Sequence, residues 1–159
     1  MKSTASVLAF TLGCALMYSP GRSDDSPERP QPPASPYLEA GRKAVEAKDF
    51  KAAVGQLAKA AQEIPNDADV HNLLGYSYRH LRQFDRSLEH YRTALKLDPN
   101  HRGAHEYIGE LYLAMGQLAN AERQLQSLYK ACPWFGRCAE HEDLKEAIEK
   151  YKARARTAP

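Results

Sequence analysis

Residues 68–101 read ADVHNLLGYSYRHLRQFDRSLEHYRTALKLDPNH, and this stretch decides the fold because its pattern occurs three times. Glycines recur 34 residues apart at Gly41, Gly75 and Gly109, and prolines keep the same step at Pro65, Pro99 and Pro133. Small residues share it at Ala53, Ser87 and Ala121, and large ones at Leu57, Tyr91 and Leu125. Self-similarity at a fixed period of this length is the signature of a repeat array.

Each unit carries the local signals of two helices joined by a short turn. Apolar residues of the middle unit, such as Leu74 and Tyr78, recur at helical spacing. The proline near the end of each unit stops a helix, because proline lacks an N–H and disfavours the helical conformation of the preceding residue. We expect the glycine that recurs every 34 residues to let the first helix approach its partner closely. The small residue at 53, 87 or 121 is the expected contact on the second helix.

At these positions the sequence resembles the tetratricopeptide repeat family, which shares the 34-residue period and the glycine, alanine and proline positions. The resemblance covers residues 34–135 and departs from the family at His71 and His105, which stand where Trp is favoured, and at Ser87. It implies an all-α fold, a right-handed α-α superhelix of three helix–turn–helix repeats. The implied helix pairs are about 36–47 with 50–63, 68–81 with 84–97, and 102–115 with 118–131.

The repeat register divides the chain into segments. We expect a signal peptide at 1–22, a Pro-rich tether at 23–35, repeats at 34–67, 68–101 and 102–135, and a capping helix at 136–155. A last repeat needs a cap with a polar outer side, because each unit buries one face against its neighbour. An apolar stripe of Leu144, Ile148, Tyr151 and Ala155 predicts the buried side of that cap.

The N-terminal segment has the features of an export signal. Lys2 precedes an apolar run from Val7 to Met17, which is shorter than the ~20 residues that span a bilayer, so a cleaved signal peptide is favoured over membrane insertion. An alternative interpretation is a lipoprotein signal that ends at Cys14, with a lipid anchor on that residue. The following residues, rich in proline and poor in apolar side chains, predict an extended tether. The expected location is periplasmic or secreted, with a membrane-anchored lipoprotein as the alternative.

Cys132 and Cys138 are the two cysteines that remain once a signal peptide is removed. In an oxidising compartment this pair predicts a disulfide that pins the capping helix. The alternative is a metal or redox carrier that uses Cys132, Cys138 and His141. That hypothesis is disfavoured, because zinc prefers four ligands and the spacing is not C-x-x-C.

Composition and motifs argue against several classes of function. The 22 basic and 20 acidic residues give a net charge of +2, without the basic excess of a nucleic-acid surface. We find no phosphate-binding glycine loop, H-E-x-x-H or nucleophile–base pattern, so the sequence predicts neither an enzyme nor a metal or cofactor site. His71 and His105 share a repeat position and are expected to pack within the fold.

The resemblance implies that the first helices of the repeats line a concave groove that binds another protein or a peptide. Mapped by repeat position, the groove residues are Leu38, Arg42, Val45, Asn72, Tyr76, Arg79, His80, Glu106 and Glu110. Some relatives hold a C-terminal carboxylate with a clamp of Lys, Asn and Arg. The corresponding positions here are Leu38, Arg42, Leu73, Gly103 and Tyr107, so clamp-type binding is disfavoured. The predicted function is a non-catalytic interaction scaffold of the cell envelope.

Overall fold

A computed structural model of the chain describes residues 35–133 and 138–157, and all the regular structure within these ranges is helical. The helices are α1 (Pro36–Glu46), α2 (Phe50–Glu63), α3 (Ala68–His80), α4 (Phe84–Leu97), α5 (Arg102–Ala114), α6 (Leu118–Ala131) and α8 (Ala139–Thr157). The predicted signal peptide and nearly all of the predicted tether lie outside the described residues. The helix bounds agree with the predicted pairs to within one residue.

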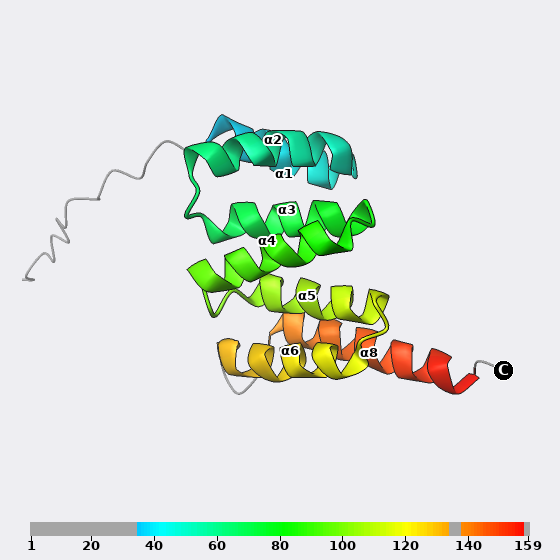
Figure 1. The fold of residues 1–159 in the computed structure, drawn as a ribbon. Coiled ribbons are helices and arrows are strands. Elements are labelled where there is room, and N and C mark those ends of the chain that lie inside the picture. The colour runs from blue at the N-terminus through cyan, green and yellow to red at the C-terminus, as the bar shows by residue number, and fades with distance from the viewer. Residues whose placement is uncertain (1–34, 134–137, 158–159) are drawn as a thin grey trace, which may run out of the picture. The chain divides into compact units, whose positions relative to one another are not determined.

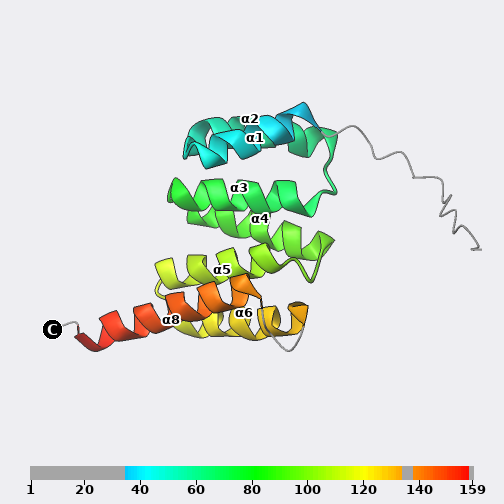
Figure 2. The same ribbon diagram turned by 180° about the vertical axis from the view of Figure 1, so that it is seen from behind.

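The helices form three successive pairs, α1 with α2, α3 with α4 and α5 with α6, followed by α8 (Figure 1). The helix α8 packs beside α5. It lies behind α6 in Figure 1 and in front of α6 in Figure 2, where the molecule is seen from the opposite side. The helix α8 therefore extends the row of first helices α1, α3 and α5. We call the surface built by these four helices the first-helix face (Figure 2).

Short polar side chains and prolines determine where the helices begin and end. Asp49 and Asp67 cap α2 and α3 by accepting hydrogen bonds from the backbone N–H groups of Ala52 and Val70, each at 3.0 Å. His101 caps α5 in the same way, with its Nδ1 accepting from Ala104 N at 3.1 Å. The helices α2, α4 and α6 all end within two residues of a repeat proline, as the sequence predicts.

The turn inside each pair uses one residue in the left-handed region. Lys48, Arg82 and Gly116 have φ values of 58°, 59° and 74°, and they lie at the same repeat position. A side chain is strained in this conformation, whereas glycine adopts it freely. The third repeat therefore makes with glycine the turn that the first two make with long basic residues.

The repeat glycines are notches that receive a large side chain from another helix. A Cβ on Gly41 would lie 2.5 Å from a Leu57 methyl group, and one on Gly75 would lie 2.6 Å from the Tyr91 ring. Both large side chains are fully buried. The predicted small contact is also present in the middle repeat, where the Ser87 hydroxyl donates to the Gly75 carbonyl at 2.7 Å.

The third notch differs from the first two. By repeat position Gly109 would receive Leu125, but a Cβ there would lie 2.6 Å from the side chain of Leu144 in α8. Leu144 is fully buried, whereas Leu125 is only partly buried. The cap therefore takes over a contact that the second helix makes in the other repeats, because α8 packs directly on α5.

The predicted apolar stripe of α8 is buried only in its first half. Leu144 and Ile148 are in the core with Leu128 of α6, and Tyr151 is half-buried. Ala155 is exposed, contrary to the expectation. The reason is visible in Figures 1 and 2, where the last turns of α8 project beyond the ends of α5 and α6 and have no helix to pack against.

Each of the two turns between repeats is bonded to the following helix pair by one histidine. The Nε2 atoms of His71 and His105 lie 3.1 Å and 3.0 Å from the carbonyl oxygens of Pro65 and Pro99. Because a carbonyl only accepts, Nε2 donates in both. Each Nδ1 faces the second helix, 3.2 Å from Nδ1 of His90 or 2.9 Å from Oε1 of Gln124. Both histidines therefore hold the fold together, as expected for this repeat position.

Candidate functional site

An arginine held between two tyrosines occupies the middle of the first-helix face. The guanidinium of Arg79 lies 5.3 Å from the ring centre of Tyr76 on its own helix and 5.7 Å from that of Tyr107 on α5. Its Nη2 atom is 2.7 Å from a carboxylate oxygen of Glu110, also on α5. We call Tyr76, Arg79, Tyr107 and Glu110 the arginine cluster. It joins the second and third repeats through the ion pair with Glu110 and the cation–π contact with Tyr107.

Aromatic rings extend this cluster toward the first repeat. The rings of Tyr76 and Tyr107 have centres 5.0 Å apart, and Tyr76 also contacts His80 at 4.4 Å. His80 in turn stacks on Phe50 of α2, with ring centres 4.2 Å apart and planes nearly parallel. The predicted residues Tyr76, Arg79 and His80 therefore belong to one continuous aromatic and cationic surface. Such side chains are enriched at the centres of protein interfaces.

Glu106 is an acid in an environment that disfavours its charge. Burial, the carboxylate of Glu110, and then Asp143 and Glu140 of α8 raise its pKa to about 7, while Arg79 opposes them. Among the described residues, Glu106 has no hydrogen bond or ion pair. Burial, Glu106 and neighbouring groups also raise the pKa of Tyr107 to about 12. The α5 side of the face therefore carries a carboxyl group that is partly protonated near neutral pH.

Three of the predicted groove residues are buried instead of lining an open surface. Leu38, Asn72 and Glu106 share one repeat position and are only 8%, 7% and 9% exposed. A partner would therefore reach little of these side chains. Val45 is half-buried against the core cluster around Leu57 of α2. Tyr76, Arg79 and Glu110 are partly exposed, and His80 is exposed.

Arg42 of α1 is engaged in a network with residues at the N-termini of α3 and α5. Its Nη2 donates to Asp69 Oδ2 at 3.0 Å, and His101 Nε2 donates to the other carboxylate oxygen at 3.0 Å. Burial opposes ionisation of Asp69, but these hydrogen bonds and charges outweigh it and hold the pKa of Asp69 below its ordinary value. The network links α1 to the N-terminus of α3 and to the N-cap of α5, so Arg42 contributes to the alignment of these first helices.

Tyr107 was absent from the predicted groove set, although it contacts both Tyr76 and Arg79. Tyr107 stands at a clamp position, where its side chain does not fit the carboxylate-clamp pattern, and the predicted groove residues of α5 are Glu106 and Glu110. A signal was present in the sequence, because Tyr107 precedes Glu110 by three residues and therefore lies on the same side of α5.

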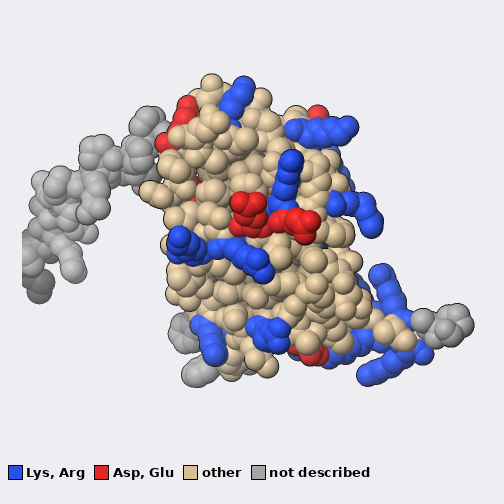
Figure 3. All heavy atoms as spheres, in the orientation of Figure 1, with Lys and Arg blue, Asp and Glu red and all other residues tan. Residues whose placement is uncertain are grey.

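A cleft continues the first-helix face between α5 and α8. Its volume is about 300 Å³, and its lining residues are Arg79, Glu110, Leu113, Ala114, Ala147, Lys150, Tyr151 and Arg154. The arginine cluster supplies two of these residues, so the cleft opens directly from it. We call this feature the α5–α8 cleft. The opposite side of the described domain, formed by α2, α4 and α6, carries basic and acidic side chains mixed together (Figure 3).

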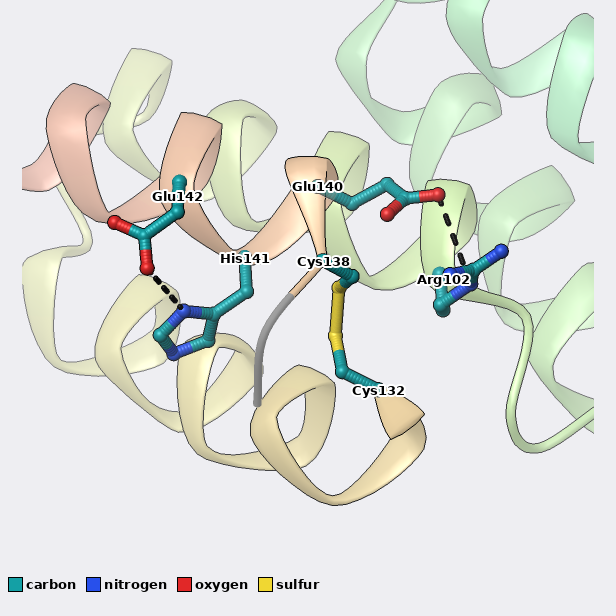
Figure 4. Close-up of a disulfide and its surroundings, with 6 residues drawn as sticks. All are labelled: Arg102, Cys132, Cys138, Glu140, His141 and Glu142. Carbon is teal, nitrogen blue, oxygen red and sulfur yellow. Dashed lines mark ion pairs between the residues drawn. A yellow bond between two sulfur atoms is a disulfide. The ribbon is translucent and has the colours of Figure 1, made fainter. Parts of the chain in front are cut away.

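The cysteine pair lies where α6 is followed by α8. The Cα atoms of Cys132 and Cys138 are 5.7 Å apart, within the span of a disulfide, and Figure 4 draws the bond between their sulfur atoms. The ring of His141 points away from the two sulfur atoms and lies 3.5 Å from Glu142 (Figure 4). Across residues 35–133 and 138–157, no three His, Cys, Asp or Glu side chains are grouped as metal ligands would be. The alternative of a metal carrier thus gains no support from the described side chains.

The same ranges contain no helix with the length and apolar content needed to cross a bilayer.

Comparison with known proteins identifies the repeat. The family model described as tetratricopeptide repeat matches residues 68–101. A curated relative, the Protein CTR9 homolog of Arabidopsis thaliana, is 27% identical over 118 residues, which are 73% of this chain but only 11% of that protein. The chain therefore spans about a tenth of the length of this relative.

Solved structures share the arrangement of helices. The TPR2B domain of yeast Sti1, in a pHsp70 complex, gives a TM-score of 0.68 at 16% identity and covers 74% of this chain and 94% of that one. The Sgt2 TPR domain from Aspergillus fumigatus gives 0.68 at 19% identity, with 82% and 86% covered. The first TPR of Spaghetti (RPAP3), bound to the HSP90 peptide SRMEEVD, gives 0.64 at 17% identity, with 74% and 90% covered.

At these identities the solved structures show the fold alone. The number and boundaries of the repeats are supported by the 34-residue spacing. The matched model coincides with α3 and α4, and the same glycine, proline and turn positions recur in the pairs on either side. These observations show that the described chain has the tetratricopeptide repeat fold, with three helix pairs and a closing helix, and that its middle pair matches the family model.

Proposed function

We propose that this protein is a non-catalytic scaffold of the cell envelope that binds a peptide or a partner domain along its first-helix face. The observation that supports the proposal most directly is the arginine cluster, which places two tyrosines and an arginine, all partly exposed, in the middle of that face. Tyrosine supplies a rigid apolar area with a polar tip, and arginine supplies a planar set of donors.

Two of the structural neighbours support a peptide or protein as the ligand. One is described in complex with pHsp70 and another with the HSP90 peptide SRMEEVD. The fold alone does not transfer these partners, because one scaffold serves many unrelated functions. At the clamp positions, Leu38 is buried and Arg42 is already paired with Asp69, so the proposal does not extend to clamp-type binding.

The location in the cell envelope rests on the sequence before residue 35 and on the cysteines. A short apolar segment after Lys2, followed by a Pro-rich stretch, is typical of an exported protein. Cys132 and Cys138 lie within disulfide reach, and such bonds persist in oxidising compartments. We therefore propose export with a disulfide between these two residues.

The mass of the native protein tests export. We expect a new N-terminus at about residues 18–26, because signal peptidases cleave shortly after the apolar segment, and a mass two hydrogens below that of the reduced chain. Alkylation before and after reduction should modify Cys132 and Cys138 only after reduction. An intact Met1 or two free thiols would contradict the proposal, and a lipid on Cys14 would favour the membrane-anchored alternative.

A substitution in the arginine cluster tests the binding surface. We expect Tyr76→Ala to weaken the binding of a partner isolated from the native envelope by about tenfold or more, because a central tyrosine is a typical hot spot. Tyr76 is more informative than Arg79, since Arg79→Ala also removes the ion pair to Glu110 and would lower stability. Isothermal titration should be accompanied by thermal melting of each variant.

Arg92→Glu serves as the control, since Arg92 is exposed on α4 of the opposite side. Tyr76→Phe retains the ring and should keep most of the affinity. If Arg92→Glu weakens binding and Tyr76→Ala does not, the partner binds elsewhere and the proposal is wrong.

A further inference from the structure

We propose that the α5–α8 cleft binds an acidic segment of the partner, in which a carboxylate lies next to an apolar side chain. The inference rests on the proposed function, because it identifies the chemistry of the ligand at one end of the first-helix face. It concerns a part of that face that extends beyond the mapped groove residues, since half of the lining residues come from α8.

The floor of the cleft is apolar and its volume fits a side chain. Leu113 and Ala114 of α5 face Ala147 and Tyr151 of α8 across a space of about 300 Å³. Leu113 and Tyr151 are half-buried, so part of each side chain remains available for contact. An apolar side chain of a ligand that enters this space would remove more of their surface from water, which favours binding.

The charges around the cleft are predominantly positive. The lining includes three cations, Arg79, Lys150 and Arg154, and one carboxylate, Glu110, which is paired with Arg79. Lys150 has an exposed partner in Glu146 at 2.7 Å, and such surface pairs contribute little and exchange readily. Arg154 has no acidic partner within 4.0 Å among the described residues. A ligand carboxylate would therefore find one arginine without a partner and one weakly engaged lysine.

The C-terminal end of α8 adds positive charge beside the cleft, whereas the acidic groups near Glu106 come from α5 and the N-terminal end of α8. From Lys150 onward α8 contains Lys150, Lys152, Arg154 and Arg156 and no acidic residue. Lys and Arg side chains gather around the C-terminal end of α8, at the lower right of Figure 3. Opposite charge on a ligand both accelerates encounter and fixes its register. A peptide that crosses the arginine cluster would reach the cleft next, because Arg79 and Glu110 belong to both.

A selection experiment tests the inference without a known partner. The probe is a phage library of random dodecapeptides selected on the full chain in its oxidised form. We expect the selected peptides to be enriched in Asp or Glu beside an aliphatic or aromatic residue. A labelled peptide from this selection should lose about tenfold or more in affinity on Arg154→Glu, and its binding should weaken as salt is raised.

Arg156→Glu provides the matched control. It lies two residues away in the same helical turn and changes the net charge equally, but it does not line the cleft. The inference requires that Arg156→Glu weakens binding much less than Arg154→Glu. Tyr151→Ala should also weaken binding, while Gln in place of the acidic residues of the peptide should reproduce the effect of Arg154→Glu.

The other outcomes overturn the inference in distinguishable ways. Peptides that depend on Tyr76, but show no acidic preference or bind Arg154→Glu normally, would overturn the inference and leave the proposed function standing. A selection that yields no peptide would count against both. Vesicles that contain one anionic lipid in about three provide a further arm. If they bind the chain and displace the peptide, with equal dependence on Arg154 and Arg156, the basic end of α8 is a lipid-binding surface and the inference is wrong.

Discussion

Replacement of Gly75 by alanine should lower the free energy of unfolding by about 1–2 kcal/mol, although alanine is the better helix former. The added methyl group would lie 2.6–2.9 Å from three ring atoms of Tyr91, a distance that real contacts do not show. The ring is fully buried and rigid, so either it or the helix must shift. Overpacking of this kind costs about 1–3 kcal/mol, and helix propensity returns up to about 1 kcal/mol.

Gly55→Ala is the matched control for this prediction. Gly55 is also inside a helix, but a Cβ there would meet no atom within 4 Å. We therefore expect Gly55→Ala to raise stability by up to about 1 kcal/mol. Urea unfolding followed by circular dichroism measures both variants. If the two substitutions have the same sign, the close packing of Gly75 against Tyr91 does not limit stability and the explanation of the repeat glycine is wrong.

Glu106→Gln should stabilise the protein at pH 8 and leave it nearly unchanged at pH 4. Burial and three nearby carboxylates raise the pKa of Glu106 from the ordinary 4.5 to about 7. An acid with a raised pKa in the folded state binds its proton more tightly there than in the unfolded chain. Stability from this group is therefore present at low pH and is lost as the pH rises from about 4.5 to 7. Glutamine removes the charge and with it a penalty on the order of 3 kcal/mol.

Thermal melting between pH 4 and 8 measures this difference. Glu46→Gln is the control, because Glu46 is exposed on α1, and that variant should follow the wild type at every pH. If the difference in stability between Glu106→Gln and the wild type is the same at pH 4 and pH 8, the folded protein accommodates the Glu106 carboxylate without cost.

The arrangement of helix pairs could be predicted because each unit repeats its own boundaries. The spacing of Gly41, Gly75 and Gly109 and of the repeat prolines placed every helix of the three pairs within a residue of its observed limits. These signals are local, since a proline or a capping aspartate acts on the residues next to it in the chain.

Contacts between repeats could not be predicted in the same way. The pair of Arg79 with Glu110 joins residues 31 positions apart, which is not a multiple of the repeat, and it depends on how two helices cross. Repeat mapping also placed Leu38, Asn72 and Glu106 in the groove, because it records which helix a residue is on but not how closely the next helix covers it. The contact of Gly109 with Leu144 instead of Leu125 could not be predicted for the same reason, because α8 is not part of the 34-residue repeat.

The packing of Leu144 against Gly109 determines where a further repeat could be inserted. In the first two repeats the glycine is packed against a large side chain of the same unit. A copied unit inserted between residues 67 and 68 would therefore contain both the glycine and its packing partner. A unit added after α6 would have to displace α8, and Gly109 would then depend on Leu125, a residue that the present packing leaves partly exposed. Lengthening by duplication is therefore open in the interior of the domain and closed at its capped end.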